Sequence, residues 1–345
     1  MNQQRILLAG FGFMGEMHAQ AVAGLEGAGI AAVVDAVPEA ARRKAERLGL
    51  AVPVYADLER ALQECDAGIV DVCLPTPQHA PAAIRALAAG RHVFCEKPVA
   101  LSVAEAREIA AAHARSRAFF QVGHCIRFWP EYQAFEQFVR GGTAGRLRSL
   151  TLQRRSARPG YSVDGWLNDP RRSLGAAVDL HIHDTDFVLH LLGEPAAVES
   201  RGTRDAEGWN HIFTDYAYPD LVVQAEGGWN YPAKWGFQMA FQAVFEDAAI
   251  EYDSRADPTL RLTRAGGAPA PLPFVPAGGA ATGTTGNLSS LGGYANELRY
   301  FLDRVASGVA PEIATLPQAI RSLDVVLAEV KSAETGRAIA IGGTA

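Results

Sequence analysis

Short apolar runs alternate with longer amphipathic stretches from Arg5 to about Val122. This alternation is typical of repeated strand–helix units around a parallel sheet. The runs predicted to be strands cover residues 6–9, 30–34, 69–74, 92–95 and 119–122. The stretches predicted to be helices cover residues 39–48, 58–63, 81–89 and 103–114. Asp57 and Ser102 are placed as helix N-caps, and Gly49 and Gly90 fall where helices would end.

The pattern changes after Gly123, where strand-like runs follow one another directly and predict a mostly antiparallel sheet. These runs cover residues 147–152, 198–202, 212–218, 221–228, 237–245 and 249–252. A Gly-, Ala- and Pro-rich loop at 266–293 precedes two predicted helices at 295–306 and 316–335. The fold class expected is therefore a doubly wound α/β domain, residues 1–123, followed by an α+β domain with an open sheet. That second domain is predicted to span 124–345 and to include the helices within 294–335.

Composition narrows the possible partners. The 345 residues are enough for two domains, and 48% of them are hydrophobic. A net charge of −6 gives no positive field that would attract nucleic acid or a membrane surface, so a small-molecule partner is favoured. The first strand follows Met1 within a few residues, without a signal-like segment, and we expect a cytoplasmic protein. Four scattered cysteines without a Cys-x-x-Cys pair predict neither a metal site nor a disulfide framework.

A glycine-rich turn carries the first chemical signal. Gly10-Phe11-Gly12-Phe13-Met14-Gly15 follows the first predicted strand and opens a predicted helix. Glycines at this spacing allow a tight turn and close approach of a pyrophosphate to the helix N-terminus. Asp35 ends the second strand about 20 residues later, where a carboxylate can accept a hydrogen bond from a ribose 2′-hydroxyl. NAD is therefore favoured over NADP, although Arg42 and Arg43 keep NADP open.

Two further segments follow predicted strands at the edge where open α/β sheets bind ligands. Leu74-Pro75-Thr76-Pro77-Gln78-His79 follows one strand, and Glu96-Lys97-Pro98 follows the next. His79 is read either as a cap or surface histidine or as a neighbour of the cofactor. A charged pair fixed by proline at a strand end favours a functional role for Lys97.

Together these motifs resemble the family of glucose-fructose oxidoreductase, inositol dehydrogenase and rhizopine-catabolism proteins (Gfo/Idh/MocA), whose hallmark is a Glu-Lys-Pro after a glycine-rich cofactor turn. The resemblance covers essentially the whole chain. It continues through Gly123–Arg127, Gly145-Arg146-Leu147, the segment from Gly175 to Asp184, and Tyr294–Leu298. Ala176 and Ala177 replace the commoner glycines of the Gly175 segment, and His181 is an addition that is more often packed than functional.

The resemblance implies roles for particular residues. Lys97, Asp179 and His183 are expected to be catalytic and to surround one substrate carbon. The expected cofactor contacts are Gly10, Phe11, Gly12, Phe13, Met14, Gly15, Asp35, Leu74, Pro75, Thr76, His79, Glu96, Lys97 and Arg127. The expected substrate contacts are Lys97, Arg127, Trp166, Asp179 and His183. Asp179 and His183 are separated by one helical turn and can face the same way.

These residue types suit hydride removal from a carbinol carbon. The hydroxyl proton needs a base that titrates near neutrality, and histidine meets that need, so His183 is the candidate base. The Lys97 ammonium would stabilise developing negative charge on the same oxygen. Asp179 would hold a substrate hydroxyl and orient the imidazole.

The expected function is NAD-dependent oxidation of a sugar, sugar acid or inositol-like cyclitol. A glycosidase that uses bound NAD transiently, or a non-catalytic dinucleotide-binding regulator, are the alternatives. Several arginines could bind an acidic group of the substrate, although most arginines in loops are solvated. They are Arg127, Arg154, Arg155, Arg158, Arg171 and Arg172. Because an open sheet needs its bare face covered, we expect a homodimer or homotetramer through the second domain's sheet.

Overall fold

The computed structural model describes residues 3–206, 208–276 and 291–342, and these residues form two compact units. Half of the predicted loop at 266–293, residues 277–290, lies outside the described residues. Unit 1 comprises the described residues of Met1–Cys125, Tyr161–Trp166 and Ala277–Arg321. Unit 2 comprises the described residues of Ile126–Gly160, Leu167–Pro276 and Ser322–Ala345.

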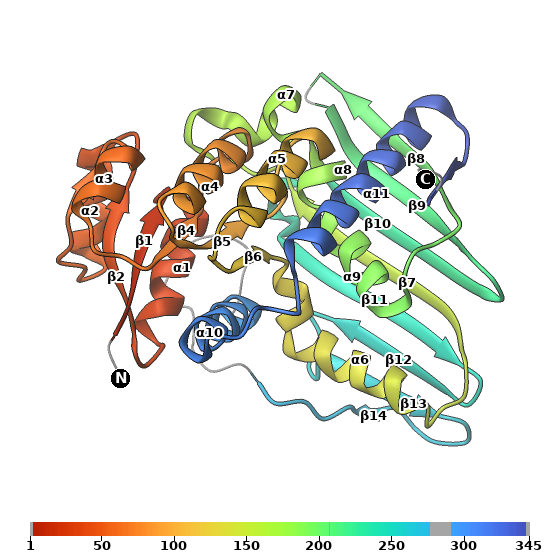
Figure 1. Ribbon diagram of the computed structural model, residues 1–345. Helices are drawn as coiled ribbons and strands as arrows, with labels where there is room; N and C mark the ends of the chain where they lie inside the picture. The colour runs from red at the N-terminus through yellow and green to blue at the C-terminus, as the bar shows by residue number, and fades with distance from the viewer. Residues whose placement is uncertain (1–2, 207, 277–290, 343–345) are drawn as a thin grey trace. The chain divides into compact units, whose positions relative to one another are not determined.

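Among its described residues, unit 1 contains six strands that pair in parallel throughout, in the order β3-β2-β1-β4-β5-β6 (Figure 1). They are β1 (Gln4–Ala9), β2 (Ala28–Val34), β3 (Val54–Tyr55), β4 (Ile69–Val72), β5 (His92–Glu96) and β6 (Phe120–Gly123). This confirms the predicted doubly wound sheet, although β3 was not among the predicted strands. The strand order reverses between β1 and β4, and ligands of open α/β sheets bind at such a switch point.

The connecting helices begin within two residues of the predicted starts. They are α1 (Phe13–Ala23), α2 (Pro38–Arg47), α3 (Leu58–Glu64), α4 (His79–Ala88) and α5 (Val103–Ala114). The Asp57 carboxylate accepts a hydrogen bond from the backbone N–H of Arg60, and the Ser102 hydroxyl accepts one from the N–H of Glu105. Both side chains therefore act as the predicted N-caps, which satisfy backbone donors that a helix leaves open.

Helix α10 (Gly292–Ser307) packs in unit 1, although the sequence analysis placed residues 294–335 in the second domain. Its apolar face, with Leu298 and Phe301, is buried in one cluster with Met17 and Val22 of α1. Each fully buried side chain of this size contributes about 1.5–3 kcal/mol. A chain segment distant in sequence thus completes the core of unit 1.

Unit 2 is built on a sheet that contains, among the described residues, nine strands in the order β14-β13-β12-β11-β7-β10-β9-β8-β15. All neighbours are antiparallel except β7 and β10, which confirms the mostly antiparallel prediction. The strands are β7 (Leu147–Ala157), β8 (Ala197–Asp205), β9 (Gly208–Tyr218), β10 (Leu221–Tyr231), β11 (Phe237–Phe245), β12 (Ala248–Asp253), β13 (Leu260–Arg264), β14 (Ala270–Pro271) and β15 (Ile339–Ala340).

Helices α6 (Pro130–Gly141), α9 (Ile182–Leu192) and α11 (Leu316–Thr335) lie over one face of this sheet (Figure 1). Tyr132 of α6 packs edge-on against Phe187 of α9 and Phe241 of β11, with ring centroids 4.8 and 5.1 Å apart. Phe135 of α6 lies 4.6 Å from the Phe241 ring. Aromatic pairs at such separations add to the burial of their area, so this cluster fixes the helices on the sheet.

The opposite face of the sheet keeps apolar side chains exposed. Phe213, Val222 and Val244 on three of its strands are 52%, 59% and 45% exposed. Exposed apolar side chains that gather on one face are typical of an interaction surface. None of the helices in the described part of the chain combines the length and the hydropathy that crossing a membrane requires.

Candidate active site

The glycine-rich turn connects β1 to α1 at the switch point of the sheet in unit 1. Gly10 has a φ of +95°, and a Cβ there would lie 2.6 Å from the Cys73 carbonyl oxygen. A Cβ on Gly15 would lie 2.1 Å from the Gly10 carbonyl oxygen, whereas one on Gly12 would meet nothing within 4 Å. The packing of the protein itself therefore requires glycine at positions 10 and 15. Gly12, in contrast, leaves open space at the start of α1. That space fits a pyrophosphate at a helix N-terminus.

Asp35 is held beside this turn at the end of β2. Its carboxylate accepts hydrogen bonds from the backbone N–H of Phe11 at 3.0 Å and of Val37 at 2.9 Å. The Lys44 ammonium, which the sequence analysis did not single out, donates to the carbonyl oxygens of Phe11 and Gly12 at 2.6 and 3.2 Å. Arg42 and Arg43 are exposed on α2. The turn and the acidic side chain are thus fixed to each other, as recognition of a ribose requires.

His79 joins the two ligand-edge segments of unit 1. Its Nδ1 lies 2.8 Å from the Pro98 carbonyl oxygen, and its Nε2 lies 2.7 Å from that of Leu74. The side chain is buried, so His79 is not a surface histidine. Burial lowers the pKa of its ring, and the two carbonyl contacts act against that effect. Whether Leu74, Pro75, Thr76 and His79 contact a cofactor stays a prediction.

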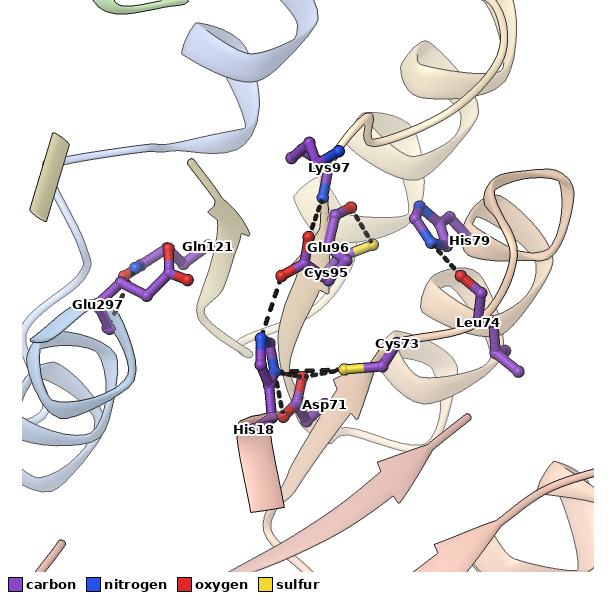
Figure 2. Close-up of polar contacts among 10 residues, drawn as sticks. All are labelled: His18, Asp71, Cys73, Leu74, His79, Cys95, Glu96, Lys97, Gln121 and Glu297. Carbon is purple, nitrogen blue, oxygen red and sulfur yellow. Dashed lines mark hydrogen bonds and ion pairs between the residues drawn. The ribbon is translucent and has the colours of Figure 1, made fainter. Parts of the chain in front are cut away.

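The Glu96 side chain below Lys97 belongs to a buried polar group, here called the histidine cluster: His18, Asp71, Cys73, Glu96 and Glu297 (Figure 2). His18 Nδ1 lies 2.9 Å from an Asp71 oxygen, and His18 Nε2 lies 3.1 Å from Glu96 Oε1. Burial alone would lower the pKa of His18, but the charge of Asp71 and the hydrogen bonds raise it well above its usual value. Burial alone would raise the pKa of Glu96, yet His18 holds it below its usual value.

Lys97 follows Glu96 at the carboxyl end of β5 and is partly exposed. Its backbone N–H donates to Glu96 Oε2 at 3.1 Å. Lys97 is thus held through its main chain at the ligand edge of the sheet, where the sequence predicted it. His18, which supports Glu96, went unnoticed in the sequence because a histidine three residues after Gly15 has no signal that distinguishes it from packing.

Asp179 and His183 lie in unit 2 and do not share one continuous helix. Asp179 ends the short helix α8 (Ala176–Asp179), and His183 lies in the first turn of α9. The helix is interrupted at Leu180 and His181, so Asp179 and His183 belong to two successive helices. That their side chains face the same way stays a prediction. Gly175 has a φ of +74°, and a Cβ there would lie 2.9 Å from the Trp209 carbonyl oxygen, so this single glycine supplies the strained position.

Two buried ion pairs anchor α9 in the turn that follows His183. Arg154 of β7 forms two hydrogen bonds of 2.9 Å with the Asp184 carboxylate, and Arg127 forms hydrogen bonds of 2.8 and 2.7 Å with that of Asp186. All four side chains are buried. These residues, here called the arginine pairs, position the helix that carries His183. Whether Arg127 also contacts cofactor or substrate stays a prediction.

The remaining candidates are placed as follows. His181 is fully buried, with Nε2 3.0 Å from Glu329 Oε2, and therefore packs inside unit 2. Arg155, Arg158 and Arg171 pair with carboxylates of this chain, namely Glu226, Asp205 and Asp169. Trp166 lies in the short 3₁₀ segment Val163–Asn168 and is partly exposed. Neighbouring Tyr161 packs its ring 4.7 Å from that of Phe13 in the glycine-rich turn.

Comparison with known proteins identifies related sequences. Residues 4–124 match the family model described as "Oxidoreductase family, NAD-binding Rossmann fold", and residues 132–251 match the "GFO/IDH/MocA C-terminal domain". The chain is 32% identical to inositol 2-dehydrogenase of Rhizobium meliloti (strain 1021) over 65% of its own length and 66% of the relative's. It is 28% identical to levoglucosan dehydrogenase of Pseudarthrobacter phenanthrenivorans over 58% and 54%. The chain thus spans just under two thirds of the first relative and about half of the second.

Solved structures show the same fold. An oxidoreductase from Agrobacterium radiobacter, in complex with NAD+, L-tartaric acid and magnesium, matches with a TM-score of 0.85 at 18% identity over 99% of both chains. A levoglucosan dehydrogenase in complex with NADH and levoglucosan matches with a TM-score of 0.83 at 20% identity over 99% of this chain and 100% of the other. At these identities the likeness shows the fold alone.

Proposed function

The chain belongs to the Gfo/Idh/MocA family of oxidoreductases, and from this premise we propose that it is an NAD-dependent dehydrogenase acting on a secondary alcohol. The proposed substrate is a sugar, a sugar acid or an inositol-like cyclitol in the cytoplasm. One observation carries the proposal: the glycine-rich turn, Asp35 and Lys97 all lie at strand ends on the ligand-binding edge of one parallel sheet. Relatives named as inositol and levoglucosan dehydrogenases support the substrate class.

The residues of unit 1 fit a dinucleotide. Gly12 leaves room for a pyrophosphate at the start of α1, and Asp35 presents a carboxylate fixed by two backbone donors. A 2′-phosphate would meet the like charge of Asp35, which favours NAD over NADP. When bound, the nicotinamide supplies the hydride chemistry. The protein's own contribution is position, charge and proton transfer.

We assign the proton and charge chemistry to three side chains on the strength of the family motif. His183 takes the proton of the substrate hydroxyl as the carbon that bears this hydroxyl becomes a carbonyl carbon. The Lys97 ammonium stabilises negative charge that develops on the same oxygen. Asp179 binds a substrate hydroxyl and orients the imidazole, which keeps the base in one tautomer. In the reverse direction the same imidazole returns the proton.

A substrate panel and a lysine substitution test this proposal. Polyols, aldoses, inositols and sugar acids are offered with NAD and, separately, with NADP, and reduced cofactor is measured by absorbance. With the best substrate, Lys97→Ala is expected to lower kcat by about 10²–10³-fold, because one preorganised charge at the reacting oxygen is lost. NAD affinity, measured by calorimetry, should hardly change.

Lys331→Ala is the matched control, because Lys331 is exposed on α11. It should turn over substrate at the wild-type rate. Undiminished turnover of Lys97→Ala would refute the role assigned to Lys97, and activity with NADP alone would refute the role of Asp35. Cleavage of a glycoside with tightly held NAD and no net reduced cofactor would replace the dehydrogenase with the hydrolytic alternative.

We also propose that the uncovered sheet face of unit 2 forms a homodimer or homotetramer. The exposed Phe213, Val222 and Val244 support this, because burial of apolar area drives association. Light scattering at micromolar concentration should show an oligomer, and Val222→Glu combined with Val244→Glu should shift it toward monomer. Val37→Glu, at a valine that is 50% exposed in unit 1, is the control. A wild-type monomer would contradict the proposal.

A further inference from the structure

His18 stands between two carboxylates inside unit 1 (Figure 2). Its Nδ1 lies 2.9 and 3.1 Å from the two oxygens of Asp71, and its Nε2 lies 3.1 Å from Glu96 Oε1. The ring is 0% exposed, and Asp71 and Glu96 are 1% and 3% exposed. A carboxylate accepts hydrogen bonds only, so both ring nitrogens must donate. His18 is therefore a buried imidazolium that bridges β4 and β5 from α1.

The surroundings of His18 support this charge. Asp71 faces His18 from β4, and Cys73 faces it from just after the end of that strand. Glu96 faces it from β5. Tyr294 and Glu297 face it from α10. Burial and Asp71 raise the pKa of the Cys73 thiol, so this group stays neutral. One cation thus stands beside two carboxylates, and buried carboxylates without a compensating cation would be costly.

The two oxygens of Glu96 have separate donors. Oε1 faces His18, and Oε2 accepts the backbone N–H of Lys97 at 3.1 Å. Gly123 of β6 leaves space for this carboxylate, since a Cβ there would lie 3.0 Å from Oε1. On the far side of Lys97, the Pro98 carbonyl oxygen contacts His79. The main chain at Lys97 is thus held from both sides by buried histidines.

We propose that His18 is a positioning residue for Lys97: as a two-way donor between Asp71 and Glu96, it fixes the Glu96 carboxylate against the Lys97 backbone. Its catalytic consequence rests on the function proposed above, because it acts through the Lys97 ammonium. Displacement of a catalytic group by about 1 Å can cost 10²-fold in rate. Loss of the His18–Glu96 bond is therefore expected to lower kcat more than it changes KM.

Two amide substitutions separate positioning from packing. Asparagine places its amide nitrogen near the position of Nδ1, and glutamine reaches the position of Nε2. His18→Gln thus keeps a donor to Glu96, whereas His18→Asn keeps only the donor to Asp71. Both remove the ring and its charge, so a purely structural role would weaken both variants alike. His113→Gln is the matched control, because His113 is a partly buried histidine of α5 outside the histidine cluster.

The first readout needs no activity. The chain has four lysines, Lys44, Lys97, Lys234 and Lys331, so selective ¹⁵N-lysine labelling isolates the backbone amide of Lys97. A hydrogen bond to a carboxylate moves an amide proton downfield. In His18→Asn this proton should move upfield, while in His18→Gln and His113→Gln it should stay near the wild-type position. An unmoved Lys97 amide in His18→Asn would overturn the proposal.

The second readout uses the wild-type protein, so it does not depend on whether a variant folds. With ¹⁵N-labelled histidine at pH 7, both nitrogens of the His18 ring should carry protons, and a neutral ring would overturn the proposal. Elemental analysis tests whether the histidine cluster holds a metal ion instead. Such an ion is conceivable there because side-chain N and O atoms of His18, Glu96 and Glu297 lie within 4.8 Å of one another. One equivalent of transition metal per chain, lost in His18→Asn, would replace the imidazolium with a metal site.

Kinetics with the best substrate of the panel complete the test. His18→Asn should lower kcat by about 10- to 100-fold with little change in the KM for NAD. His18→Gln should retain most of the turnover. Equal losses in the two variants would show that His18 serves packing alone. If Lys97→Ala is fully active while the Lys97 amide still responds to His18→Asn, the proposed role of Lys97 fails and the structural link stands.

Discussion

The arginine pairs of unit 2 and the histidine cluster of unit 1 both bury charged side chains, but they neutralise them differently. In unit 2, each arginine pair joins one guanidinium to both oxygens of one carboxylate, with hydrogen bonds of 2.7–2.9 Å. A guanidinium is charged throughout the pH range in which proteins fold, so such pairs need no proton to stay balanced. In unit 1, the histidine cluster sets three carboxyl groups around one imidazole. Its charge balance therefore depends on bound protons.

This difference makes the two groups of residues respond differently to pH. The pKa of His18 is raised in the folded state, so its stabilisation is complete below the unfolded value near 6.5 and is lost as pH rises through the folded value. Burial, and next the charge of Glu96, raise the pKa of Glu297, so folding loses stability as pH rises above the unfolded value of 4.5. The lowered pKa of Glu96 acts oppositely and stabilises above that value. Unit 1 should thus lose stability in alkaline solution.

Breaking an arginine pair is the largest expected effect. Arg154→Leu leaves the Asp184 carboxylate buried without its cation, and we expect a loss of about 3–5 kcal/mol in the free energy of unfolding of unit 2. Urea titration followed by tryptophan fluorescence measures it, because Trp129, Trp209, Trp229 and Trp235 all lie in unit 2.

Arg158→Leu provides the comparison for that substitution. Arg158 pairs with Asp205 at 2.7 Å, but the two side chains are 32% and 50% exposed. Solvent screens such a pair, so its loss should be under about 1 kcal/mol. Equal losses in the two variants would show that burial of the Arg154–Asp184 pair does not set its contribution to stability.

The fold could be predicted from the sequence where a local pattern determines an element. Helix α11 has the predicted bounds of 316–335, and the caps at Asp57 and Ser102 need only a side-chain oxygen and a nearby backbone donor. The membership of α10 could not be predicted this way. Its apolar face fits any hydrophobic core, and only its packing against Met17 and Val22 places it in unit 1.

In the candidate site, too, the features set by local sequence could be predicted and the long-range contacts could not. The glycine-rich turn, Asp35 and Lys97 follow strands, so strand order and direction bring them to one edge of the sheet. The supporting contacts join residues far apart in sequence, such as His18 with Glu96 or Arg154 with Asp184, and no periodicity links them. The break after Asp179 was also hidden, because the residues around it are compatible with a continuous helix and the Gly175 turn is set by close approach to Trp209.

A smaller, pH-dependent effect is expected from Glu297. Its side chain is 0% exposed, and neither carboxyl oxygen has a hydrogen-bond partner within the described residues. Because its pKa is raised, the folded chain keeps the neutral acid to a higher pH than the unfolded chain does, and glutamine is a neutral residue of similar shape. Glu297→Gln should therefore match the wild type near pH 5 and melt about 2–4 °C higher at pH 8.5, which corresponds to about 1 kcal/mol. Scanning calorimetry at several pH values measures the slope.

Glu312→Gln is the control, because Glu312 belongs to unit 1 and its side chain is 76% exposed. Its melting temperature should follow the wild-type slope. If Glu297→Gln also follows that slope, Glu297 is ionised in the folded state and a further cation must balance it. If instead the slope flattens only in Glu297→Gln, the histidine cluster is held by a bound proton where the arginine pairs use a permanent charge.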